Sequence, residues 1–201
     1  ISSELNNPNA LAGRVLSPAL YGPTHPYGAT AASGTRATVA AITRDDLTSF
    51  HQRWIRPDNA SIFVVGDTTL RNLVTELNRA FGDWRPPSIA RGTKDFSASL
   101  PQQTPHILLV NRPNSPQSVI VSAQVLDGVT GRDDLLTLRS ANDVLGGNFL
   151  SRINMNLRET KGWSYGASSR IGSVRENLIF RVTAPVQADR TGDSIREIQS
   201  D

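Results

Sequence analysis

The histidines are the first residues to test for chemistry, because imidazole is the commonest metal ligand and general base in proteins. The chain has three, His25, His51 and His106, and no cysteine. No two histidines lie four positions apart, the spacing that brings two imidazoles onto one helix face for zinc. We therefore predict no metal site or cofactor in this chain, and the lack of cysteine excludes disulfides and thiolate ligands.

Two other kinds of site depend on glycine-rich turns. The sequence contains neither Gly-x-Ser-x-Gly, which presents a nucleophilic serine on a sharp turn, nor the phosphate-binding Gly-x-Gly-x-x-Gly. Gly146, Gly147 and Asn148 offer backbone N–H groups to an anion at a helix start. A corner between two helices is the alternative that we favour, because helix ends commonly use Gly.

The overall composition excludes several classes of partner. Lys and Arg number 21 against 18 Asp and Glu, a net charge of +3 with no concentrated basic patch, so nucleic acid is not an expected partner. No apolar run approaches the ~18–20 residues that a membrane-spanning helix needs. The 201 residues suit one ordinary domain or two small ones.

Capping signals and hydrophobic periodicity predict the elements of the first half. Thr43 followed by Asp46 forms a capping box, and Pro57 ends the helix that it starts. The continuous apolar run at 60–65 predicts a buried strand. We expect helices at 10–20, 44–56 and 70–81, and an ordered, turn-rich loop at 21–28.

Periodicity is lost at 85–105, which therefore has the character of a linker. Beyond it, strands and helices occur in separate runs, a pattern that favours an α+β fold with antiparallel sheets and helices packed on one face. The elements expected are strands at 106–111, 117–125, 163–171 and 178–184, with helices at 133–145, 148–159 and from 187 onward.

The most specific pattern lies between Leu145 and Gly166. A Gly-rich corner is followed by Ser-Arg-Ile, Leu-Arg-Glu and Lys-Gly-Trp-Ser-Tyr. This segment resembles the M16 (insulinase-like, pitrilysin) zinc metallopeptidases, in particular the non-zinc-binding C-terminal region of bacterial, M16B-like members. The resemblance covers about residues 20–185, and further matching motifs occur in order at His25–Gly28, Ile42–Leu47, Arg56–Asn59, Val64–Asp67 and Gln117-Ser118.

The resemblance implies homologous α/β units arranged around an enclosed chamber, with zinc held by a His-x-x-Glu-His helix. This sequence lacks that motif, and Glu4 matches the family's distal zinc-ligand Glu too poorly to be assigned. We expect 1–84 to be the end of one M16-type unit and 85–105 to be a linker. Residues 106–201 would hold most of the following unit, truncated at its C-terminus.

Arg158 and Tyr165 match the Arg and Tyr with which the family's zinc-free half contacts substrate. The Tyr165 hydroxyl would donate to the scissile carbonyl oxygen, and Arg158 would donate to peptide carbonyls or a carboxylate. Gly162 and Gly166 would let the backbone turn so that both side chains lie on one side. The alternative is structural: Arg158 as a cation at a helix C-terminus and Tyr165 as an ordinary strand aromatic.

The resemblance implies part of a zinc-dependent peptidase, in which this chain, inactive alone, binds and orients peptide substrates. Zinc would be bound by an M16 half in the same polypeptide or in a partner chain. The alternative is a proteolytically inactive M16-like scaffold or partner-binding subunit. The compartment stays open between bacterial periplasm and cytoplasm. We interpret Tyr27 as packing, Trp54 as core and Arg152 as a hydrogen-bonding residue of the corner.

Overall fold

The computed structural model describes residues 1–29, 33–102, 104–126, 135–174 and 177–201. They form two compact units, one made of Ile1–Thr35 with Asp95–Asp201 and the other of Arg36–Lys94. These units divide the chain differently from the boundaries at 84 and 105, and the assignment of those boundaries to homologous units stays a prediction. The first unit contains α1 (Ser2–Asn6), α2 (Pro8–Tyr21), β1 (Gln117–Leu126), α6 (Leu135–Asn142), η2 (Asp143–Gly147), α7 (Arg152–Asn154), η3 (Met155–Thr160), β2 (Ser168–Val174), β3 (Asn177–Gln187), η4 (Ala188–Arg190) and α8 (Thr191–Ser200).

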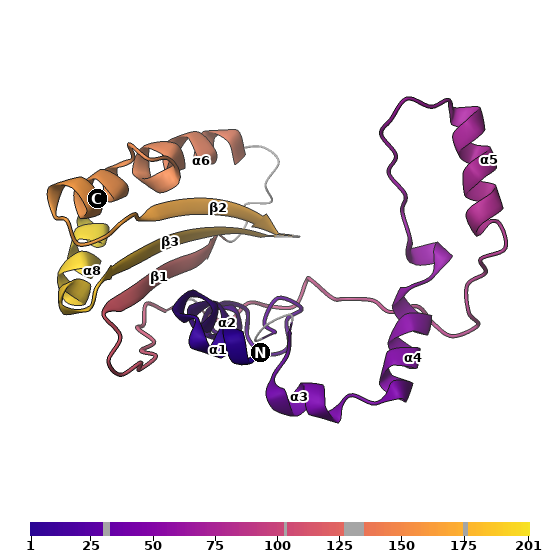
Figure 1. Cartoon of the computed structure of the whole chain (residues 1–201), viewed down its shortest axis with the longest axis horizontal. Coiled ribbons are helices and arrows are strands. Elements are labelled where there is room, and N and C mark those ends of the chain that lie inside the picture. The colour runs from indigo at the N-terminus through magenta and orange to yellow at the C-terminus, as the bar shows by residue number, and fades with distance from the viewer. Residues whose placement is uncertain (30–32, 103, 127–134, 175–176) are drawn as a thin grey trace. The chain divides into compact units, whose positions relative to one another are not determined.

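A three-stranded antiparallel sheet with the order β1-β3-β2 is the centre of the first unit (Figure 1). The register places Gln117 opposite Gln187 between β1 and β3, and Val174 opposite Asn177 between β2 and β3. Both strand pairs, β1 with β3 and β2 with β3, are antiparallel, so the α+β class with an antiparallel sheet is confirmed.

Apolar side chains cover both faces of this sheet. On one face, Leu157 of η3 packs with Val182 and Ala184 of β3. On the other, Leu20 of α2 packs with Val125 of β1. Figure 1 accordingly shows α6 above the sheet and α2 below it. Helices therefore lie against both faces rather than one, because side chains alternate along a strand and both of the sets they form are apolar here.

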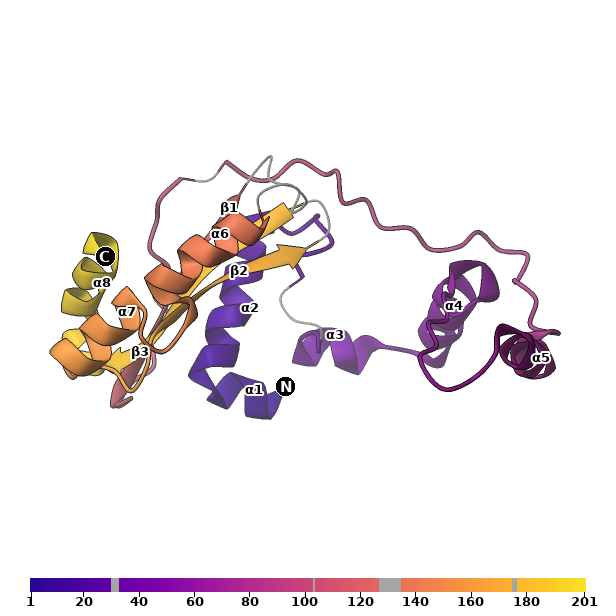
Figure 2. The same ribbon diagram turned by 90° about the horizontal axis from the view of Figure 1, so that it is seen from above.

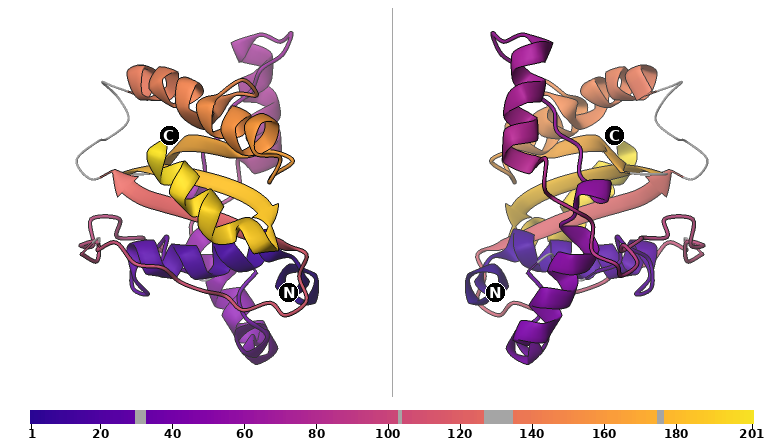
Figure 3. Two further views of the ribbon diagram at one scale, coloured as in Figure 1. Left: turned by 90° about the vertical axis from the view of Figure 1, so that its left-hand side faces the viewer. Right: turned by 90° about the vertical axis from the view of Figure 1, so that its right-hand side faces the viewer.

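The helices of the first face come from two parts of the sequence, α6 and α7 between β1 and β2, and α8 after β3. In the view from above, α6 lies over the strands and α7 continues beyond it (Figure 2). The left view of Figure 3 shows α8 lying across the strands, where Ile198 packs against the core. Among the described residues, no helix is both long and apolar enough to cross a membrane.

The second unit, Arg36–Lys94, is built from short helices and extended segments. The predicted capping box is confirmed: the Asp46 N–H donates to Thr43 Oγ1 at 3.2 Å, and the Thr43 N–H donates to Asp46 Oδ2 at 2.8 Å. All residues of this unit are described, and Arg56 is the only one that is buried. The elements are α3 (Arg36–Ala41), α4 (Arg44–Trp54), η1 (Pro57–Asn59) and α5 (Leu70–Phe81).

The two strands predicted at 60–65 and 106–111 are not formed. Neither segment pairs with another strand among the described residues. Phe63 in the first is 92% exposed to solvent, and Leu109 in the second is 89% exposed. Continuous apolar runs are typical of strands buried on both sides, but a strand exists only where another strand accepts its hydrogen bonds. The prediction of these two strands was wrong, because an apolar run indicates a tendency to form a strand but not whether a second strand is present to pair with it.

Two other boundaries shift by several residues. The helix expected from 148 begins at Arg152, because the Asn148 side chain accepts a hydrogen bond from the Leu150 N–H at 2.9 Å and holds a turn there. The strand expected from 163 begins at Ser168. Before it, the Trp163 N–H donates to the Leu157 carbonyl at 2.9 Å, which ties the chain to η3 rather than to the sheet.

Candidate functional site

The helix that carries Arg158 is short and widely wound. It begins as α7 after Ser151 and continues as η3, a π-helical stretch that reaches Thr160. Gly162 follows with φ of +67°, a left-handed conformation that favours glycine, and the chain turns back there toward β2. The turn expected at Gly162 is therefore present, and it brings residues 164–168 alongside the helix.

Arg158 bridges this helix to the returning segment. Its Nη1 donates to the backbone carbonyl of Tyr165 at 2.8 Å, and its Nε donates to Glu159 Oε1 at 3.0 Å. The guanidinium carbon lies 4.7 Å from the centre of the Phe149 ring, a cation–π arrangement. Arg158 is thus held by three contacts at a fixed place on the surface.

Tyr165 meets Arg158 through its backbone only. The residue is 86% exposed, and its ring is not among the groups that line the pocket beside Arg158. The structure thus brings the two sequence-predicted residues together, but it leaves the Tyr165 hydroxyl directed to solvent.

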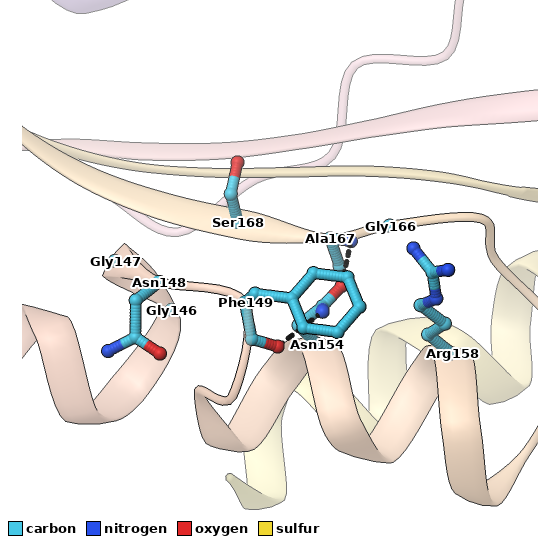
Figure 4. Close-up of a pocket in the computed structure, with 9 residues that line it drawn as sticks. All are labelled: Gly146, Gly147, Asn148, Phe149, Asn154, Arg158, Gly166, Ala167 and Ser168. Atoms are coloured by element: carbon cyan, nitrogen blue, oxygen red, sulfur yellow. Dashed lines mark hydrogen bonds between the residues drawn. The ribbon is translucent and has the colours of Figure 1, made fainter.

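An open pocket of about 350 Å³ lies beside Arg158 (Figure 4). We call it the corner pocket, because one wall is the corner between η2 and α7 and the other is the start of β2. Arg158 is the only charged residue in its lining. The lining residues are Gly146, Gly147, Asn148, Phe149, Asn154, Arg158, Gly166, Ala167 and Ser168.

Asn154 joins the two walls of the corner pocket. Its Nδ2 donates to the Phe149 carbonyl at 2.7 Å, and its Oδ1 accepts from the Ala167 N–H at 3.0 Å (Figure 4). The side chain is only 4% exposed, so both hydrogen bonds are sheltered from water. Asn154 therefore fixes the width of the pocket.

A second buried amide holds the corner against the sheet. Asn142 Nδ2 donates to the Ser169 carbonyl at 3.1 Å, and Ser169 Oγ donates back to Asn142 Oδ1 at 2.7 Å. Gly146 approaches so closely that a Cβ there would lie 2.6 Å from the Ser169 backbone nitrogen. Close packing explains this glycine, which supports the corner interpretation over the anion-site alternative.

The far side of the helix is tied to α8 by a carboxylate. Asn156 Nδ2 donates to Glu197 Oε2 at 2.9 Å, and Lys161 Nζ lies 2.9 Å from Glu197 Oε1. These hydrogen bonds, first that from Asn156 and then that from Lys161, hold the pKa of Glu197 below its usual value. The charged form of Glu197 thus helps to position η3.

The histidines and acidic residues do not make a zinc site in the described parts of the chain. His25 is buried, stacks on Tyr21 with ring centroids 5.0 Å apart, and accepts the Tyr27 N–H on Nδ1 at 3.1 Å. His51 is exposed on α4, and His106 Nδ1 lies 2.7 Å from the Thr104 carbonyl. No group of three potential ligands occurs among these residues, so the donor set does not fit a catalytic zinc ion.

The remaining expectations have mixed outcomes. Tyr27 packs as expected, with its ring centroid 5.4 Å from that of Tyr21.

Trp54 is only half-buried and stacks on Phe50, so its predicted place in a core was wrong. Arg152 is exposed and donates no side-chain hydrogen bond to a described residue, which contradicts its predicted role. Glu4, which we do not assign as a zinc ligand, pairs with Arg14 at 2.9 Å.

Sequence reasoning missed Asn154 and the role of Phe149. The only local signal was an asparagine inside a predicted helix, where its side chain is unfavourable unless it finds a specific partner. Those partners are the Phe149 carbonyl and the Ala167 N–H, and the latter is distant in sequence. The role of Asn154 is therefore visible only in the tertiary structure, where residues 164–168 lie beside the helix.

Comparison with known proteins agrees with this architecture. A "Uncharacterized zinc protease" of Mycobacterium tuberculosis is 28% identical over 193 residues, which cover 94% of this chain and 42% of that protein. The "Uncharacterized zinc protease YmxG" of Bacillus subtilis is 24% identical over 94% of this chain and 45% of that protein. The chain therefore spans less than half the length of these relatives.

Solved structures show the same fold. The peptidase M16 inactive domain from Pseudomonas fluorescens superposes with a TM-score of 0.83 and 24% identity, over 99% of this chain and 47% of that one. A protease from Helicobacter pylori gives a TM-score of 0.83 at 19% identity, over 98% and 47%. Residues 41–200 match the sequence family described as the peptidase M16 inactive domain. The chain belongs to the peptidase M16 family, as one of its inactive domains.

Proposed function

We propose that this chain is the substrate-holding part of a zinc-dependent peptidase. The observation that carries the proposal is the immobilised Arg158 beside an open pocket, with Tyr165 exposed next to it. Zinc-protease relatives more than twice as long as this chain support a second half that would bind the metal. Zinc there would activate water and polarise the scissile carbonyl.

The share of this chain is binding and orientation. Arg158 presents N–H groups from a fixed guanidinium, which limits the entropy lost when a peptide binds. Tyr165 is exposed, and its hydroxyl donates to a carbonyl oxygen as negative charge develops there. Both residues lie at the surface, so an unfolded peptide reaches them without any change in the core.

Peptide cleavage by the full-length protein, together with a partner subunit if the zinc half is separate, tests the proposal. We expect chelator-sensitive cleavage of quenched-fluorescence peptides. Arg158→Ala and Tyr165→Phe should each lower kcat/KM at least tenfold, about 1.4 kcal/mol of transition-state stabilisation. Arg152→Ala is the matched control, an exposed arginine on the same helix.

Each result discriminates. Cleavage that is unchanged in the folded Arg158 and Tyr165 variants would remove both residues from the site while keeping the peptidase. A zinc-loaded assembly that cleaves no peptide would favour the scaffold function instead. Circular dichroism of each variant shows that it has folded.

A further inference from the structure

The corner pocket carries an inference that rests on the proposed function and makes its substrate class specific. We infer that the pocket binds the carboxylate of an acidic side chain in the peptide, with Arg158 as its anchor. Arg158 is the charged residue among those that line the pocket, and Glu159, which pairs with its Nε at 3.0 Å, is not one of them. The cationic group within the lining is the feature that points to an anionic ligand. Hydrogen bonds to a charged partner are roughly twice as strong as those between neutral groups.

The contacts of the guanidinium leave one end of it for a ligand. Nε is taken by Glu159 and Nη1 by the Tyr165 carbonyl. Among the residues that the structure describes, none accepts a hydrogen bond from Nη2. Arginine remains charged at all ordinary pH values, so this end presents two N–H groups and a permanent positive charge.

The aromatic wall favours a side chain with methylene groups before its carboxylate. Phe149 lies under the guanidinium and is itself more than half exposed. An acidic side chain that reaches Nη2 would cover part of this ring with its aliphatic stem. The pocket would thus bury apolar surface and neutralise a charge with one residue of the peptide.

The pocket is formed before any ligand arrives. Asn154 holds the Phe149 and Ala167 walls through two sheltered hydrogen bonds, and the Tyr165 carbonyl fixes the guanidinium. Little conformational entropy is therefore lost when a peptide binds, so a charged side chain raises the affinity by nearly its full interaction energy with Arg158. An arginine without these contacts would distinguish less well between acidic and neutral side chains of the peptide.

Pairs of peptides that differ only by Glu or Gln at one position test this inference. Fluorescence anisotropy would measure their binding to the full-length protein, both zinc-loaded and after chelation, as the pair is moved along the peptide. At one position we expect the Glu peptide to bind at least tenfold more tightly. Arg158→Gln should bring this ratio close to one, whereas Arg152→Gln, the matched control, should preserve it.

The outcomes separate the inference from the proposed function. Equal binding of Glu and Gln peptides at every position would overturn the acidic preference, even where cleavage still depends on Arg158. A preference that survives Arg158→Gln would overturn Arg158 as the anchor. Failure of every peptide to bind would overturn both proposals. A ratio that falls as salt rises from 50 to 500 mM would add support, because salt screens a partly exposed charge pair.

Discussion

The two units of the molecule differ in what holds them together. In the first, Leu157 of η3 and Leu178 and Val186 of β3 are fully buried. In Arg36–Lys94, no apolar residue is buried, and α4 and α5 expose their apolar stripes. The exposed side chains include Leu47, Phe50, Phe63, Val65, Leu70 and Phe81.

A polar residue organises the second unit instead of an apolar core. Arg56 pairs with Asp58 through Nε and Nη2, and its Nη1 donates to the Ile89 carbonyl at 2.8 Å. The comparison teaches that hydrophobic periodicity is enough to form α4 and α5 but not to bury them. Burial needs a second surface, which the sheet supplies in the first unit only.

The largest expected effect is on stability, and it tests whether only the first unit has an apolar core. Leu157→Ala should lower the free energy of unfolding by about 2–5 kcal/mol, because it leaves a cavity against β3. Phe63→Ala should change it by less than ~0.5 kcal/mol, because that side chain is exposed. Urea denaturation followed by circular dichroism measures both. Similar losses in the two variants would show that the second unit has a core of its own.

The next effect is confined to the second unit. Arg56→Ala removes the contacts to Asp58 and the Ile89 carbonyl, so the segment 87–92 should open more often. The Gly92 N–H donates to the Arg53 carbonyl at 2.9 Å, and this amide should exchange with solvent roughly tenfold faster, while the amides of β3 stay protected. Arg53→Ala, an exposed neighbour, is the control in the same hydrogen-exchange experiment. Unchanged exchange in Arg56→Ala would contradict its organising role.

A smaller effect concerns the caps of the exposed helices. Thr43→Ala should cost α4 about 1 kcal/mol, because the Thr43 hydroxyl accepts the Asp46 N–H and donates to Asp46 Oδ2, and both of these bonds are lost while the backbone N–H of position 43 still donates to Asp46. Thr69→Ala should cost α5 less, since that cap accepts only from the Asn72 N–H. Exchange of the first-turn amides measures each loss. Equal effects at the two caps would argue against the additional bond from the Thr43 hydroxyl to Asp46.

The smallest effect depends on pH and returns to the first unit. The pKa of Glu197 is lower in the folded than in the unfolded chain, so its contribution is present above the unfolded pKa. That contribution should disappear as pH falls through the folded pKa, below about 4.5. Glu197→Gln should flatten the stability curve between pH 5 and 3, measured by thermal unfolding. An unaltered slope would contradict the carboxylate's role in holding η3.

Local patterns in the sequence were sufficient for several features. Thr43 and Asp46 are three residues apart, and they form the predicted cap without help from distant parts of the chain. Gly162 adopts the left-handed conformation of the expected turn. The helix expected at 70–81 appears with those boundaries, because the Thr69 side chain caps its start. The strand expected from 117 also begins at Gln117, although its pairing depends on β3.

The candidate site could be predicted only in part from local patterns in the sequence. The motif placed Arg158 and Tyr165 seven residues apart, but not the carbonyl contact between them or the solvent-directed ring. The corner pocket depends on Asn154 reaching Ala167, thirteen residues further along the chain. This bond requires the reversal of the chain at Gly162, which brings Ala167 beside Asn154.

The sequence by itself therefore determined the helices with caps, the turns with glycine and the family pattern around Arg158. Tertiary structure alone decided which apolar segments are buried, since 60–65 and 106–111 have the composition of strands and no partner among the described residues. It also decided the width of the pocket and the direction of its charged group. The physical reason is that caps and turns are satisfied by bonds to near neighbours, whereas sheets, cores and pockets need surfaces that distant segments bring together.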